Sequence, residues 1–135
     1  MLAEAVLKIL PDDLYAKTQY KNCYFTGAQG ADPFFWYRPL KKKGYNLGRM
    51  MHRKDVYGFF AAVKDAVKVD GGREAAYAYG YITHYAVDTV FHPYVYGLEK
   101  EIVSKLPKRR KKDKIHFLIE RDIDSFIFEE YETRR

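Results

Sequence analysis

Three residues that can bind a metal ion are spaced four apart in an apolar stretch of the chain. His84, Asp88 and His92 lie in GYITHYAVDTVFHPY, where almost every other residue is apolar or aromatic. Burying a carboxylate is costly unless it is paired or binds a metal, and no Lys or Arg stands beside Asp88 in the sequence. Residues four apart lie on one face of a helix, one turn above the other. The pattern therefore predicts that Asp88 shares a metal ion with either neighbouring histidine.

The same spacing predicts two ions rather than one. His84 and His92 would be about 12 Å apart along a helix axis, at about 1.5 Å per residue. A zinc–nitrogen bond is only about 2.0–2.1 Å long. One ion cannot easily bind both histidines, so the stretch predicts two neighbouring metals.

Further residues that can bind a metal occur elsewhere in the chain. His116 and Glu120 are four apart in KIHFLIERDID, with Asp124 one turn further on, while His52 lies in GRMMHRKD and Asp32 in GAQGADPFF. Each has a simpler interpretation on its own, because a His–Glu pair stabilises a helix and aspartate is common in turns. Their joint occurrence favours metal binding.

Helices must position these residues, and the sequence predicts an all-α bundle. Apolar residues recur every three or four positions in segments 2–10, 13–22, 47–68 and 114–133. Segment 74–99 is apolar on all sides, which indicates either a membrane span or the buried central helix of a bundle. Its tyrosines, two histidines, Asp88 and Pro93 favour the second interpretation. Segment 25–45, rich in glycine, proline and aromatics, is typical of an ordered loop.

Composition restricts the class of protein. A chain of 135 residues that is 47% hydrophobic predicts one domain, residues 1–135. A single cysteine, Cys23, excludes an intrachain disulfide framework and favours a reducing compartment. The start, MLAEAVLKILPDDL, lacks the basic region and uninterrupted apolar core of a signal peptide. We therefore expect a cytoplasmic location and no transmembrane segment.

The ordered series GAQGADPFF, LGRMMH, AYAYGYITHYAVDTVFHPY and HFLIERDID resembles the zinc-dependent phospholipase C family, whose fold is shared with S1/P1-type nucleases. The resemblance covers about residues 27–124 and implies two zinc ions. The first would be bound by Asp32, His52, His84 and Asp88, and the second by His92, His116 and Glu120. For Asp124 it implies no more than orienting a ligand histidine.

The resemblance also implies phosphodiester hydrolysis of a substrate such as a phospholipid, because zinc ions hold phosphate oxygens and activate water. Glu120 or Asp32 would accept the proton of that water, and the sequence does not choose between them. Two other functions stay open: a single-strand nuclease, and an inactive metal-binding interaction module. The basic run at residues 105–114, including Lys108–Lys112, is a solvated loop or contacts an anionic membrane, with nucleic acid a less favoured partner.

One feature departs from the family pattern. Members generally hold a third zinc with a histidine near the N-terminus and with the aspartate that is Asp88 here. No histidine precedes His52. Either the natural start lies upstream, or the protein works with two metals, or it is inactive. The similarity of LAEAVLKILPDDL to the family's first helix favours the upstream start, and a third zinc would be weak or absent in this chain.

Overall fold

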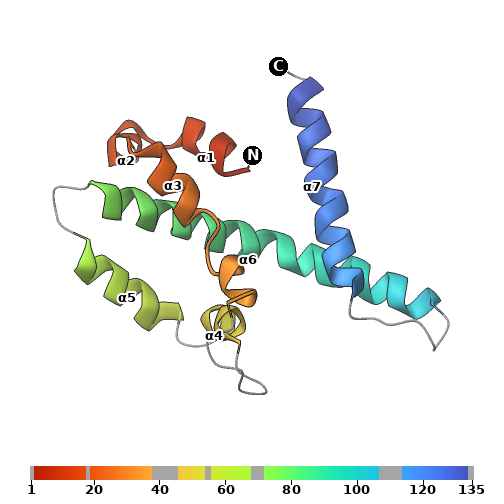
Figure 1. Cartoon of the computed structure of the whole chain (residues 1–135). Coiled ribbons are helices and arrows are strands. Elements are labelled where there is room, and N and C mark those ends of the chain that lie inside the picture. The colour runs from red at the N-terminus through yellow and green to blue at the C-terminus, as the bar shows by residue number, and fades with distance from the viewer. Residues whose placement is uncertain are drawn as a thin grey trace. The chain divides into compact units, whose positions relative to one another are not determined.

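The computed structural model describes residues 2–17, 19–37, 46–53, 56–67, 72–106 and 114–133. Helices and no strand occur in these ranges, which confirms the predicted all-α fold class (Figure 1). Contacts divide the chain into two compact units, residues 2–85 and 86–135. The predicted single domain stays a prediction.

The described elements follow one another along the chain. In order they are α1 (Leu2–Ile9), α2 (Asp12–Lys17), α3 (Lys21–Gly27), the 3₁₀ helix η1 (Asp32–Phe35), α4 (Leu47–Arg53), α5 (Val56–Ala66), α6 (Arg73–Lys105) and α7 (Ile115–Thr133). Helix α6 extends the predicted central helix at both ends and continues through Pro93. Helix α7 confirms the last predicted helix.

Two of the predicted helices each correspond to a pair of described helices. The helix expected over residues 13–22 is wrong, because α2 ends at Lys17 and α3 begins at Lys21. The N–H groups of Cys23 and Tyr24 bond to the carbonyl of Tyr20 at 2.9 and 3.1 Å, which starts a new helix there. Within the helix expected over residues 47–68, the structure describes α4 and α5, and residues 54–55 and 68 lie outside the described residues. Short helices depend on tertiary packing more than on local propensity, so the break after Lys17 has no strong sequence signal.

The core of the unit 2–85 is centred on Tyr24, which is fully buried against Leu7 and Ala76. The Tyr24 hydroxyl donates to the carbonyl of Ala3 at 3.1 Å and shares a hydrogen bond of 3.0 Å with the hydroxyl of Thr83, in which either group can donate. Burial raises the pKa of the Tyr24 phenol, which favours the neutral form that these bonds need. One side chain therefore joins α1, α3 and α6.

Helices α3 and α6 approach each other at two glycines. A Cβ atom on Gly80 would lie 2.0 Å from the carbonyl oxygen of Tyr24, and one on Gly27 would lie 2.0 Å from that of Tyr77. No side chain fits between the two backbones. This contact fixes where the chain leaves α3, just before the segment that contains Asp32.

Aromatic rings join α5 to α6 within the same unit. The rings of Phe59 and Phe60 lie 4.7 and 6.0 Å from the ring of Tyr81, measured between centroids. Tyr81 is itself buried, one turn before His84 on α6. This packing supports the part of α6 that carries the first candidate ligand.

The unit 86–135 has its own core. Val95 on α6 is buried with Ile115 and Ile119 on α7, and Ile123 packs against them. Within the described ranges, no helix combines the length and the hydropathy needed to cross a membrane. The predicted membrane-contacting run Lys108–Lys112 lies outside the described residues.

We expect Tyr24→Phe to lower the free energy of unfolding by about 1–2 kcal/mol, because the Thr83 hydroxyl and the Ala3 carbonyl lose a buried partner. Urea denaturation of both proteins would measure the difference. Tyr57→Phe is the control, since Tyr57 is 87% exposed. Equal stability of the Tyr24→Phe variant and the unmodified chain would contradict the role of this hydroxyl.

Candidate metal centres

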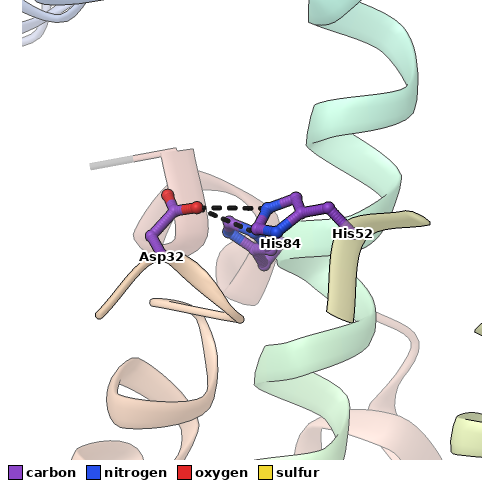
Figure 2. A group of neighbouring side chains, drawn as sticks. All are labelled: Asp32, His52 and His84. Carbon is purple, nitrogen blue, oxygen red and sulfur yellow. Dashed lines mark ion pairs between the residues drawn. The ribbon is translucent and has the colours of Figure 1, made fainter. Parts of the chain in front are cut away.

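The first group of candidate ligands lies in the unit 2–85 and comes from three elements. Asp32 on η1, His52 on α4 and His84 on α6 each present one ligand atom, and these atoms lie within 4.8 Å of one another. Figure 2 shows the Asp32 carboxylate facing both imidazole rings. Its Oδ1 atom is 3.2 Å from Nε2 of His52 and 3.8 Å from Nε2 of His84.

These distances fit a zinc ion. Ligand atoms about 2.0 Å from a tetrahedral zinc lie about 3.3 Å from one another, and the two measured distances lie on either side of that value. The 3.8 Å distance is too long for a hydrogen bond. The donors, one carboxylate and two imidazoles, are those that zinc takes in proteins.

Gly30 sets the turn that brings Asp32 to His84. It has a φ of 58° and lies against the His84 ring, where an added Cβ atom would come within 2.0 Å of Cδ2. Its N–H bonds to the carbonyl of Gly27 at 2.8 Å, which closes the end of α3. Position 30 requires glycine for two reasons. Glycine readily adopts a positive φ, and it has no side chain to collide with the His84 ring.

Asn46 joins the elements that carry Asp32 and His52. Its Oδ1 atom accepts from the N–H of Arg49 at 2.8 Å and caps α4, while its amide donates to the carbonyl of Phe35 at 3.0 Å. The Phe35 ring lies 4.9 Å from the His52 ring. These contacts therefore pack α4 against η1.

The second group lies in the unit 86–135. His92, His116 and Glu120 present ligand atoms within 4.8 Å of one another. The Oε1 atom of Glu120 is 3.0 Å from Nε2 of His116 and 3.6 Å from Nε2 of His92. Both distances again lie near the tetrahedral value of about 3.3 Å. The His92 and His116 rings are stacked 5.6 Å apart, and the Tyr96 ring lies close to both.

In two of the histidines, Nε2 is the ring nitrogen that can bind a metal. Nδ1 of His52 lies 2.7 Å from the carbonyl oxygen of Gly48, and Nδ1 of His92 lies 3.1 Å from that of Asp88. A carbonyl only accepts, so Nδ1 is the protonated nitrogen in both rings. The lone pair of each neutral ring is then on Nε2, the atom that faces the carboxylate of its group.

The remaining predicted residues are placed as follows. Asp88 lies beside the second group, with Oδ2 3.7 Å from Nδ1 of His92, and is in neither group of three among the described residues. Its role as a ligand of the first zinc stays a prediction. Asp124 is exposed and, in the described part of the chain, bonds to none of the histidines. Of the aromatic run after Asp32, Phe35 contacts His52 and Trp36 is 84% exposed.

Glu99 is a residue beside the second group that no sequence pattern predicted. Its Oε2 atom lies 3.1 Å from Nδ1 of His116. A signal was present, because His92, Tyr96 and Glu99 follow each other at spacings of four and three, which place them on one face of α6. The partner, His116, is distant in sequence, and only the packing of α7 on α6 brings the two together.

The comparisons with known proteins agree with this chemistry. A family model described as zinc dependent phospholipase C matches residues 1–135, the whole chain. No curated protein and no solved structure gives a significant match.

We expect Gly30→Ala to weaken zinc binding at the first group by about tenfold or more, because the new methyl group would displace the His84 ring. Titration calorimetry with zinc would measure the loss, and circular dichroism would establish that the helices remain. Gly97→Ala is the matched control, since a Cβ atom there meets nothing within 4 Å. If both variants bind zinc alike, Gly30 does not position His84.

Proposed function

The chain belongs to the zinc-dependent phospholipase C family, and we propose that it hydrolyses a phosphodiester, such as that of a phospholipid, with zinc bound at both groups. The first group is Asp32, His52 and His84, and the second is His92, His116 and Glu120. One observation carries the proposal. In each group a single carboxylate oxygen faces two imidazole nitrogens at distances near those between the ligands of one zinc ion.

The charge of each group suits an anionic substrate. One carboxylate and two neutral imidazoles leave one net positive charge on a bound zinc ion. Zinc supplies a lowered pKa for a bound water and a charge that attracts phosphate oxygens. The three side chains of a group would leave the fourth position of a tetrahedral zinc open for a water or a phosphate oxygen.

Two carboxylates are candidates for the proton acceptor. Asp32 and Glu120 each face both histidines of their group through one oxygen, Oδ1 and Oε1 respectively. The second oxygen of the same carboxylate can accept a proton from water. Both side chains are partly exposed to solvent, which water access requires.

The first test is the metal content. We expect elemental analysis of zinc-replete protein to find close to two equivalents. Removal of zinc with a chelator should lower the melting temperature, because a ligand present at about 100 times its Kd stabilises the folded state by about 2.7 kcal/mol. A zinc content near zero, with no change in melting temperature, would contradict both sites.

The second test is hydrolysis. We expect the zinc-loaded chain to cleave a chromogenic phosphocholine ester or phosphatidylcholine vesicles, and Asp32→Asn and Glu120→Gln each to lower kcat/KM at least about a hundredfold. The variant that keeps its zinc but loses activity identifies the proton acceptor. Glu101→Gln is the control, since Glu101 is exposed and pairs with Lys105.

The other outcomes separate the remaining functions. Cleavage of single-stranded DNA in preference to either phosphocholine substrate would support the nuclease instead. Two bound zinc ions with no hydrolysis of any of the three substrates would support the inactive interaction module.

A further inference from the structure

The two ring nitrogens of His116 face two different carboxylates. Nε2 lies 3.0 Å from Oε1 of Glu120, which belongs to the second group. Nδ1 lies 3.1 Å from Oε2 of Glu99 on α6. A neutral imidazole carries one proton, so only one of its nitrogens can donate and the other keeps its lone pair. Which carboxylate receives the proton decides which nitrogen can bind a metal.

The described Nδ1 contact of His116 differs in kind from those of His52 and His92. His52 and His92 each donate from Nδ1 to the carbonyl of the residue four positions earlier in the same helix. His116 is the second residue of α7, which begins at Ile115. The residue four positions before it, Lys112, lies outside the described residues. The described partner of its Nδ1 atom is the Glu99 side chain on α6.

We propose that Glu99 is a positioning residue that accepts the Nδ1 proton of His116 and so directs the Nε2 lone pair toward the second zinc site. The inference rests on the proposed zinc at His92, His116 and Glu120. If Glu99 accepts this proton, then His52, His92 and His116 all present Nε2 to a metal.

Burial and packing support this role. The side chains of Glu99 and His116 are both more than two-thirds buried, which strengthens a hydrogen bond to a charged acceptor. The Tyr96 ring lies 5.4 Å from the His92 ring and 5.2 Å from the His116 ring, and it limits rotation of both. Carboxylates that bond to a ligand histidine raise its basicity, and their loss costs about 10–100-fold in metal affinity.

The test begins with the zinc-free protein, where activity plays no part. Long-range ¹H–¹⁵N correlation spectra at about pH 8.5, about two units above the ordinary histidine pKa, show which nitrogen of each ring is protonated. We expect the Nδ1–H form of His116 in the unmodified chain. Glu99→Ala should shift His116 toward the Nε2–H form, while His52 and His92 keep theirs.

Zinc affinity is the second readout. We expect Glu99→Ala to lower the affinity of the second site about 10–100-fold while the first site is unchanged. The zinc affinity of the second site in Glu99→Gln should fall between the affinities in Glu99→Ala and in the unmodified chain. An amide can accept from Nδ1–H, but it can also donate to an unprotonated Nδ1. Glu101→Gln, two residues further along α6, is the matched control for loss of a carboxylate.

Three results would overturn the inference. One is an Nε2–H form of His116 in the unmodified chain, and another is an unchanged tautomer in Glu99→Ala. The third is complete loss of the second zinc in Glu99→Gln with the tautomer retained, which would make Glu99 a direct ligand. If the tautomer and the affinity change as expected but the chain hydrolyses no phosphodiester, the role of Glu99 stands and the proposed function fails.

Discussion

The close approach of α3 to α6 is the constraint on which the first group depends. Because Gly27 and Gly80 let the two backbones touch, α3 ends directly beside α6. The turn at Gly30 then lies against the His84 ring and brings Oδ1 of Asp32 within 3.8 Å of Nε2 of His84. Tyr24, on α3, stabilises the same contact because its hydroxyl forms a hydrogen bond with Thr83 on α6, the residue before His84. The packing of α3 on α6 therefore also determines the position of Asp32.

Helix α6 supplies a histidine to each group. The histidine rings of the two groups are oriented in two ways. Beyond the first turn of a helix, the preceding turn offers a carbonyl to Nδ1, as it does for His52 and His92. For His116, the described acceptor beside Nδ1 is instead a side chain of another element, Glu99 on α6. A carbonyl of the same helix and a carboxylate of a neighbouring helix thus offer an acceptor to the same ring nitrogen.

Local patterns were enough to predict the all-α class, the central helix and the pairing of His116 with Glu120, because all of these depend on residues within a few turns. The association of Asp32 with His52 and His84 came from the family resemblance, since no local spacing links a loop residue to two helices. The break after Lys17 was missed because no proline or glycine marks it. Glu99 and Asn46 were missed because their partners are set by packing between elements.

The unequal exposure of the first group has a consequence for how an ion enters and leaves. The Asp32 side chain is 59% exposed, whereas those of His52 and His84 are 23% and 12% exposed. A hydrated cation therefore meets the carboxylate first, while it still keeps most of its water, and reaches the imidazoles only as that water is shed. Dissociation must follow the same route in reverse. The surroundings of the Asp32 carboxylate, rather than those of either imidazole, would then govern the rate of metal exchange.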